Sequence, residues 1–399
     1  QIMFLLKNAL LLLALLFPLK NLFAESEKKI NNQSNTTFSD FIPKLQSENG
    51  DYSLKLKGRL MVDVGQELES DASHLDNEIM LRRSRIEVFG KLGKNFSYLN
   101  SYNINHKNTE VVDAYLTFEG IKNLKITAGH LVANTNMEGK TSSLTNPFIE
   151  RSISYSPFTK HRRVGLLFNY FKQDWAIKVG AFGSELSKNQ MSDKSRLINS
   201  RFYFLPMSNL DNSHYLHLGI NASYQKIESF DKSLTFKSQT PSVIEKTIAN
   251  TGSIENIESY KQYVPEFRYQ NGPFSANLEY YKSYLERKNL GNLTFSGGYI
   301  SSSYFLTKSS YDYGIEDGTP ESVINSKNAI EIVTRYSYLD LNDKGVTGGK
   351  LKSYDLGVNY YLNDNFRVML SYIANKSKDA PSISDRNSQL LIMRLQANF

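Results

Sequence analysis

Cysteine is absent from this chain of 399 residues, and tryptophan occurs only once. Without cysteine no disulfide can hold the fold together, so stability must come from another source, such as a closed hydrogen-bonded sheet. After residue 24 no apolar run is long enough for a helix that spans a bilayer. These absences exclude a disulfide-rich scaffold and a bundle of transmembrane helices.

Motifs of catalysis and metal binding are also missing. The six histidines form no HExxH pattern, and no GxSxG elbow occurs. His214 and His217 are three residues apart, which places them on opposite faces of a strand and makes them poor joint metal ligands. The sequence therefore predicts neither an enzyme nor a metal site, and no cofactor.

The amino-terminal segment has the organisation of a secretion signal. Lys7 precedes an almost entirely apolar run from Ala9 to Leu19, and a small-residue cleavage site follows at Ala24. This run is too short to span a bilayer comfortably, so a membrane anchor is the weaker interpretation. We predict a signal peptide over residues 1–24 and a polar periplasmic lead-in over residues 25–50.

From residue 51 onward, segments of about ten residues alternate between apolar and polar side chains. In the stretch LKLKGRLMVDV, Leu60 and Val62 share one face of an extended strand, and Arg59 and Asp63 share the other. Successive side chains of a strand point to opposite faces, so each segment has an apolar side and a polar side.

Aromatic residues flank these segments and close the chain. The sequence holds 25 tyrosines and 23 phenylalanines, and its last segment, SQLLIMRLQANF, ends at Phe399. A soluble β-sandwich also alternates, but aromatic girdles are typical of outer-membrane barrels. The negative mean hydropathy of the chain is compatible with a membrane barrel, because only every second residue of a barrel strand faces lipid. We predict an all-β fold, a transmembrane antiparallel β-barrel over residues 51–399 in the bacterial outer membrane.

Counting the alternating segments gives about sixteen strands, joined by alternately short and long connections. The predicted spans are 54–66, 78–91, 95–105, 110–120, 123–131, 161–172, 174–184, 197–205, 213–226, 259–270, 273–286, 292–308, 327–340, 350–362, 364–376 and 388–399. Residues 132–160 form a long excursion after the fifth strand, and residues 309–326 are long where a short periplasmic turn is expected. Such stretches are usually functional, so each is a candidate to fold into the lumen.

The distribution of charge along the chain favours a channel for small anions over a surface that binds nucleic acid. The net charge is +7, but the basic residues are scattered and follow a secretion signal. Some arginines occupy the alternate strand positions whose side chains would point into the barrel, which we call lumen parity. They are Arg59, Arg83, Arg85, Arg335, Arg367 and Arg394. Arg82 has the opposite parity, so it needs a β-bulge or a strand end to join them. Arg162 and Arg163, at a strand start, are expected to contact lipid headgroups or lipopolysaccharide.

Several stretches are distinctive in their order and spacing. They are LKGRLMVD, LRRSRIEVFGKL, VVDAYLTFEG, HRRVGLLFNY, NGPFSANLEYY, SGGYISSSYFLT and the closing TRYSYLDLNDKGVTGGKLKSYDLGVNYYLNDNFRVMLSYI. From about residue 57 to the end, the chain thereby resembles the phosphate-selective porins O and P. The resemblance implies a sixteen-stranded barrel, assembly as a homotrimer, and an anion-selective pore with phosphate as the leading cargo.

The resemblance also implies residues of the pore wall. The family's arginine ladder corresponds to Arg59 in GRLMVD and to Arg82, Arg83 and Arg85 in LRRSRIEV. Its acidic wall residue, which holds a basic neighbour in place, corresponds to Asp113 in VVDAYL. A guanidinium presents a planar fork of donors that matches phosphate or carboxylate oxygens, and it stays charged at any physiological pH.

The inward-folded loop of the family corresponds to MEGKTSSLTNPFIER. In it, Lys140 matches the lysine that coordinates the anion, and Arg151 lies nearby in the sequence. Where a second lysine is expected after the loop's Ser-Ser pair, this chain has Leu144.

The combined prediction is an outer-membrane diffusion channel for small anions, surrounded by lipid and lipopolysaccharide. Alternatives that stay open are a general, weakly selective porin, a channel for another small solute, an outer-membrane barrel enzyme such as a lipase, and an adhesin or phage receptor. A barrel interior must be polar whatever its selectivity, so arginines that merely pair with lumen carboxylates are a competing interpretation.

Overall fold

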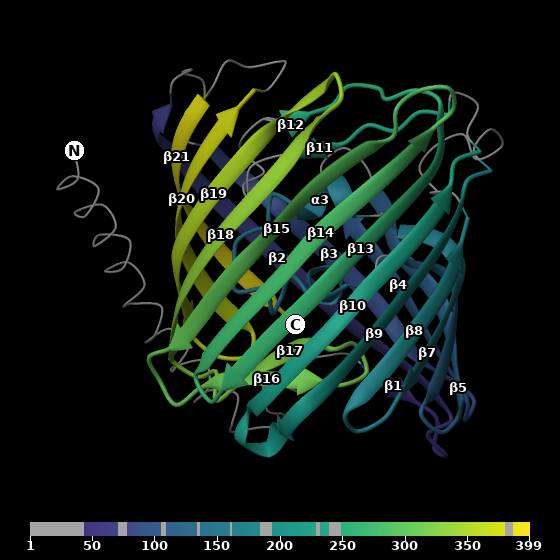
Figure 1. The fold of residues 1–399 in the computed structure, drawn as a ribbon. Helices are drawn as coiled ribbons and strands as arrows, with labels where there is room; N and C mark the ends of the chain where they lie inside the picture. Colours follow the sequence, from purple (N-terminus) through teal and green to yellow (C-terminus); the bar gives the residue numbers. More distant parts are fainter. Residues whose placement is uncertain are drawn as a thin grey trace.

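The computed structural model describes residues 44–70, 78–104, 109–133, 136–159, 162–183, 194–228, 232–238, 249–379 and 386–399. Its main sheet contains 17 strands, of which β1 (Lys44–Gln46) pairs only with one end of β2. The other sixteen are antiparallel and close into a barrel, because the last strand pairs with the first (Figure 1). The predicted signal peptide and the lead-in up to residue 43 lie outside the described residues.

The barrel strands agree with the predicted spans to within four residues at each end. They are β2 (Tyr52–Ser70), β3 (Glu78–Leu92), β4 (Phe96–Ile104), β5 (Thr109–Ile121), β6 (Leu124–Val132), β7 (Arg162–Phe171), β8 (Trp175–Phe182), β9 (Arg196–Asn209), β10 (His214–Lys226), β13 (Ile257–Asn271), β14 (Phe274–Arg287), β15 (Leu293–Phe305), β18 (Ala329–Asp343), β19 (Val346–Tyr361), β20 (Phe366–Lys378) and β21 (Arg386–Asn398). A closed sheet of this kind satisfies its backbone hydrogen bonds without leaving a free edge.

Apolar side chains cover the outside of the barrel and polar ones fill its inside. On β19, Tyr354, Leu356 and Val358 are 46, 56 and 44% exposed, whereas Asp355 and Asn359 between and beside them are 4 and 0% exposed. In a bilayer the exposed row meets hydrocarbon, as the alternation predicts. In the described part of the chain, no helix has the length and apolar character that crossing a membrane requires.

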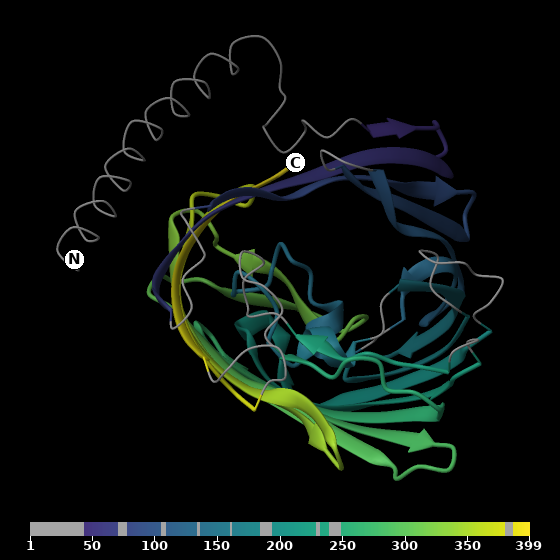
Figure 2. The same ribbon diagram turned by 90° about the horizontal axis from the view of Figure 1, so that it is seen from above.

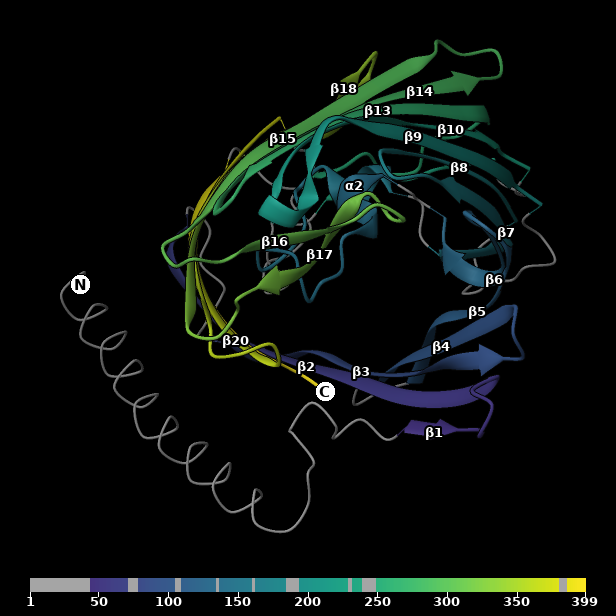
Figure 3. The ribbon, with the colours of Figure 1, turned by 90° about the horizontal axis from the view of Figure 1, so that it is seen from below.

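Two connections fold into the lumen, as the views along the barrel show (Figures 2 and 3). The lumen loop, described over residues 136–159, follows β6 and contains α2 (Met137–Lys140) and α3 (Tyr155–Phe158). The lumen hairpin, residues 306–328, follows β15 and contains β16 (Ser310–Gly314) and β17 (Thr319–Ile324). The hairpin enters at the barrel end that carries the short turns, which the sequence predicts to be periplasmic. Both long connections singled out in the sequence therefore lie inside the barrel.

The largest apolar core also lies inside the barrel, where loop residues pack against the wall. Phe158 of α3 is fully buried and stacks on Tyr281 of β14 at 5.8 Å between ring centroids. Phe236 contacts Phe158 from a further connection that carries the short strands β11 (Lys237–Ser238) and β12 (Ala249–Asn250). Because this core occupies the side near β13 to β15, polar space remains on the side of β2 to β7.

Candidate functional site: a basic cavity in the barrel lumen

A basic cavity lies between the lumen loop and one side of the barrel wall. Its volume is ≈ 350 Å³, and it is lined by strands β2 to β7 and by residues 139–143 of the loop. The seven residues predicted for the site all line it: Arg59, Arg82, Arg83, Arg85, Asp113, Lys140 and Arg151. With Arg162, the lining has seven cationic side chains against two carboxylates, those of Glu87 and Asp113, so positive charge is in excess by five.

Arg82 reaches the cavity through a β-bulge. In the ladder between β2 and β3, Met61 pairs with Arg83 and Val62 pairs with Leu81, so Arg82 has no cross-strand partner. An extra residue on one strand redirects its side chain without ending the sheet. Arg82 and its neighbour Arg83 therefore both line the lumen, as the sequence required.

Arg59 and Arg85 lie directly opposite each other on β2 and β3. Arg59 Nη2 is 2.7 Å from Glu87 Oε1, and Arg59 Nη1 donates to Ser143 Oγ of the lumen loop at 3.1 Å. Arg85 Nε donates to Asn103 Oδ1 at 2.8 Å, and within the described residues Arg85 forms no ion pair. Like charges opposite each other repel, so this pair favours an anion between its side chains.

Glu150 of the lumen loop is shared by three arginines. It accepts two hydrogen bonds from Arg82, at 2.8 and 3.0 Å, and one from Arg394 Nη2 at 2.8 Å, while Arg83 Nη2 lies 3.6 Å away. Asp63 also pairs with Arg394, so two carboxylates face three guanidinium groups and one positive charge remains in this corner. Burial raises the pKa of Glu150, but these arginines outweigh it and hold the pKa well below its ordinary value.

The depressed pKa of Glu150 predicts a pH-dependent contribution to stability. Its ionised form is favoured in the folded state, so the contribution is complete above the unfolded pKa of about 4.3 and is lost as pH falls below that value. We expect Glu150→Gln to lower the free energy of unfolding by about 2 kcal/mol at neutral pH, and by progressively less in acid. Thermal unfolding in detergent at a series of pH values measures this, with the exposed Glu255→Gln as control. A difference from wild type that stays constant with pH contradicts the prediction.

Asp113 is paired within the same cavity. It accepts hydrogen bonds from Arg162 Nε and Nη2 at 2.8 and 3.1 Å. This pair corrects the sequence prediction for Arg162, which lines the lumen cavity instead of facing lipid headgroups. Arg162 is at the start of β7, next to the end of β6, and a strand start gave no signal of which way its side chain would turn.

Lys140 and Arg151 have different roles in the lumen loop. Lys140 ends α2, and its Nζ lies 3.2 Å from Asp317 Oδ1 of the lumen hairpin. Arg151 donates to the carbonyl oxygens of Glu138 and Thr141, each at 2.9 Å, and its guanidinium lies 4.6 Å from the ring centroid of Tyr155. Arg151 thus lines the cavity, but most of its donors hold the loop's own backbone.

The match to a family of known proteins covers this whole barrel. Residues 54–399 fit the family described as phosphate-selective porin O and P. The chain belongs to this family. It is 24% identical over 391 residues to Porin O of Pseudomonas aeruginosa, covering 88% of this chain and 89% of that protein. It is 26% identical over 348 residues to an uncharacterized protein of Caulobacter vibrioides, covering 82 and 69% of the two chains.

Solved structures agree on the fold of this porin. The anion-selective porin of Comamonas acidovorans superposes with a TM-score of 0.60 at 12% identity, covering 87% of this chain and all 100% of that one. OmpT of Vibrio cholerae gives a TM-score of 0.58 at 13% identity, covering 89 and 99%. This family and this fold are those of a channel rather than an enzyme, and they place the porin in the bacterial outer membrane. Among the described residues no cluster of histidine and carboxylate groups is arranged to hold a metal ion.

A second set of lumen arginines in the porin anchors the loop instead of lining the cavity. Arg335 Nη2 donates to Glu150 O at 3.0 Å, Arg367 Nη1 donates to Asn146 O at 3.1 Å, and Arg394 Nη1 donates to Ile149 O. All three arginines have the predicted lumen parity and are buried. Each arginine gives one donor to a loop carbonyl and others to wall side chains, so these arginines hold the loop against the wall of β18 to β21.

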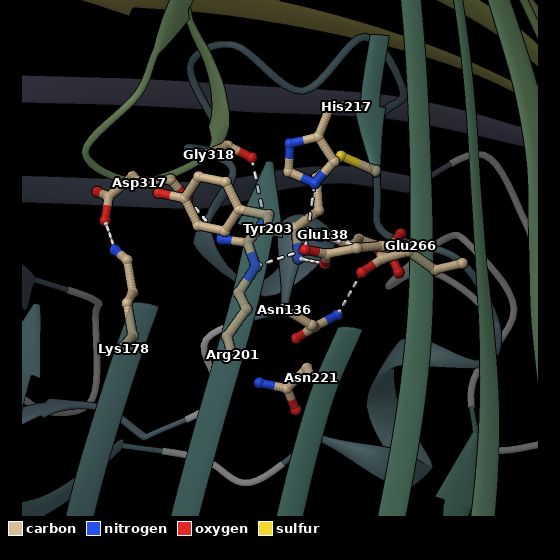
Figure 4. A network of polar contacts seen from close by, with 12 residues as sticks. Asn136, Glu138, Lys178, Arg201, Tyr203, His217, Asn221, Glu266, Asp317 and Gly318 are labelled. Carbon is tan, nitrogen blue, oxygen red and sulfur yellow. Dashed lines mark hydrogen bonds and ion pairs between the residues drawn. The ribbon is translucent and has the colours of Figure 1, made fainter. Parts of the chain in front are cut away.

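Two wall carboxylates hold the start of the same loop, and one of them, Glu266, is shown in Figure 4. Glu266 of β13 accepts a hydrogen bond from Met137 N at 2.8 Å, and Glu279 of β14 accepts one from Glu138 N at 2.9 Å. Asn136 Nδ2 adds a bond to Glu279 at 3.0 Å. The sequence indicated Glu279 only as a general lumen carboxylate and gave no role to Glu266, although carboxylates at lumen parity on neighbouring strands were a visible signal. Their effect is to fix the turn that presents Lys140.

Lys140 lies where two cavities meet. A second cavity of ≈ 330 Å³ continues from the basic one toward the short-turn end of the barrel, and Asp113, Val132 and Lys140 line both. Its other charged residues are of both signs, among them Lys125, Lys178, Glu119, Glu316 and Asp317. Lys140 is therefore the basic residue common to both cavities on this side of the lumen.

Proposed function

We propose that this porin is an anion-selective diffusion channel, with phosphate or a related small anion as its cargo. The observation that carries the proposal is the lining of the basic cavity, where seven cationic side chains face two carboxylates. The family is described as phosphate-selective and the porin of Comamonas acidovorans as anion-selective, which supports the same solute class. The runner-up is a general porin with weak selectivity, because any porin lumen is polar.

The cavity replaces part of the water shell that an entering anion loses. Arg59, Arg83 and Arg85 offer several guanidinium donors in succession, and Arg85 has an uncharged partner, so its charge is available to a solute. Several moderate sites let an ion enter and then move on, whereas one very tight site would trap it. Lys140, at the junction of the cavities, is the next donor on this path.

The proposal is tested on the purified protein in planar lipid bilayers. In a potassium chloride gradient the zero-current potential should have the sign of a chloride-selective pore, and added phosphate should reduce the chloride current. A zero-current potential near zero, with no effect of phosphate, favours the general porin instead. An assay for ester hydrolysis on the same sample should be negative.

Lys140→Gln should weaken the block of chloride current by phosphate. Removing one partly buried ammonium group from the junction is expected to raise the half-blocking phosphate concentration roughly fivefold, because such a charge contributes up to about 1 kcal/mol. Lys122→Gln, in the exposed turn after β5, is the matched control and should leave the block unchanged. An unaltered block in Lys140→Gln removes this residue from the anion path.

The remaining parts of the proposal concern export and assembly. Residues 1–24 act as a signal peptide and residues 25–50 as a periplasmic lead-in before the barrel. The porin assembles as a homotrimer among outer-membrane lipid and lipopolysaccharide; a trimer form of Vibrio cholerae OmpT, with a TM-score of 0.56, supports that assembly. Amino-terminal sequencing of the exported protein and its mass in detergent test these two points, and a mass of one chain contradicts the trimer.

A further inference from the structure

The tip of the lumen hairpin places one carboxylate, that of Asp317, between two lysines from different elements. Figure 4 shows its contact with Lys178. Asp317 Oδ1 accepts a hydrogen bond from Lys178 Nζ of β8 and lies 3.2 Å from Lys140 Nζ of the lumen loop. All three side chains line the second cavity. Two ammonium groups that converge on one oxygen atom are an arrangement that equally suits an oxygen of phosphate or of a carboxylic acid.

The three side chains differ in how far they are exposed to a solute in the cavity. The side chain of Asp317 is 38% exposed toward the cavity, that of Lys140 is 21% exposed, and that of Lys178 is 1% exposed. A solute can therefore reach Asp317 and Lys140, while Lys178 lies beneath the carboxylate. Burial raises the pKa of Asp317, but the two lysines outweigh it and hold the pKa well below its ordinary value, so the carboxylate is ionised at neutral pH.

The hairpin tip is held in place mainly by its backbone. Arg201 of β9 donates to Asp317 O and Gly318 O at 2.5 and 3.0 Å. Tyr203 Oη donates to Ile315 O at 2.5 Å. Gly318 has a φ of +63°, and a Cβ there would come within 2.6 Å of the Tyr203 ring, so the close approach requires glycine. These contacts keep the tip docked without the Asp317 side chain.

The neighbouring charges are already balanced. Arg201 Nε lies 2.6 Å from Glu266 Oε1, and Lys125 Nζ lies 2.7 Å from Glu316 Oε2. What remains is the pair of lysines against the single carboxylate of Asp317. Such a group has an excess of one positive charge, and it would have an excess of two if the carboxylate were neutral.

We propose that Lys140 and Lys178 form a second anion-binding site, and that Asp317 is its resident counter-ion, which a permeating phosphate or carboxylate replaces. The inference rests on the proposed function and adds to it a residue that sets how tightly the anion is held. Because Asp317 competes for the same donors, it weakens binding at this point, and the anion leaves toward the short-turn end of the barrel. A carboxylate tethered to the channel thereby prevents the trapping that two free lysines would cause.

The test is Asp317→Asn, which keeps the shape of the side chain and removes its charge. We expect the phosphate concentration that half-blocks the chloride current to fall roughly tenfold, since a competing charge next to the site is lost. Asp312→Asn is the matched control, because Asp312 is an exposed carboxylate of the same hairpin that does not line the second cavity, and it should leave the half-block unchanged. Asp317→Glu retains the charge and should keep the half-block near that of wild type.

A double variant separates charge competition from movement of the hairpin. Adding Lys178→Gln to Asp317→Asn should abolish the gain in phosphate block, because the second donor of the site is then gone. If Asp317→Asn leaves the half-block of a phosphate-sensitive wild type unchanged, or if the gain survives without Lys178, this inference is overturned. If the wild type itself shows no anion preference, the proposed function fails instead.

Discussion

Replacing both Arg83 and Arg85 with glutamate is expected to abolish the anion preference of the channel. Each substitution changes the charge of the basic cavity by two, so the excess of five positive charges in its lining falls to one. Both side chains lie on one strand, β3, beside the bulge at Arg82, so the change is concentrated at a single part of the wall. Field strength in a confined lumen follows this local charge far more than the net charge of the whole protein.

The zero-current potential in a potassium chloride gradient measures this prediction. It should move from the chloride-selective side to near zero, and the phosphate block should weaken at the same time. Lys288→Glu with Lys344→Glu makes the same total change of charge in exposed turns at the end of the barrel, outside the cavity lining, and should shift the potential far less. If the arginine variant keeps the wild-type potential, these arginines are solvated wall residues without a part in selectivity.

Replacing Arg394 with methionine should release the lumen loop from the wall and destabilise the barrel. Arg394 is 1% exposed, and its Nε and Nη2 lie 2.6 and 2.7 Å from the carboxylate of Asp63. Its remaining donor groups bind Glu150 and Ile149 O of the loop. Methionine fills similar space but leaves Asp63 buried and unpaired, and removing one partner of a buried pair costs about 3–5 kcal/mol.

Two measurements test the effect of Arg394→Met. The free energy of unfolding in detergent should fall by the amount given above, and single-channel conductance should become larger or noisier because the loop no longer lies against β21. Arg196→Met, at the exposed start of β9, is the matched control and should change stability by less than about 0.5 kcal/mol. Wild-type stability and conductance in Arg394→Met would show that the loop is held without this arginine.

Alternation along the chain predicted the strands, and the aromatic residues that flank them favoured a membrane barrel over a soluble sandwich. The parity of Arg59, Arg83 and Arg85 follows from counting residues along a strand, because successive side chains point to opposite faces. The same count predicted that Arg82 needs a β-bulge or a strand end to face the lumen, and the pairing of β2 with β3 shows the bulge. The family resemblance located Lys140 in the loop, where it does line the basic cavity.

Position along a strand could not distinguish the arginines that line the basic cavity from those that anchor the lumen loop. Arg85 and Arg394 are the same residue type, both on strands and both facing inward, yet Arg85 lines the cavity and Arg394 is covered by the loop. The difference arises because the lumen loop lies against β18 to β21 and leaves the side of β2 to β7 open. No local pattern specifies on which wall a loop will pack.

The sequence by itself determined that this protein is a closed sheet with an apolar outside and a charged inside, since that pattern repeats every two residues and needs no knowledge of distant partners. Only the tertiary structure decided which charges remain accessible to a solute. Asp317 and Lys178 are 139 positions apart, and they meet because a hairpin from one end of the barrel and a strand of its wall occupy the same place in the lumen. Contacts of this kind depend on how the inserted segments share the interior, and the alternation of single strands carries no information about that.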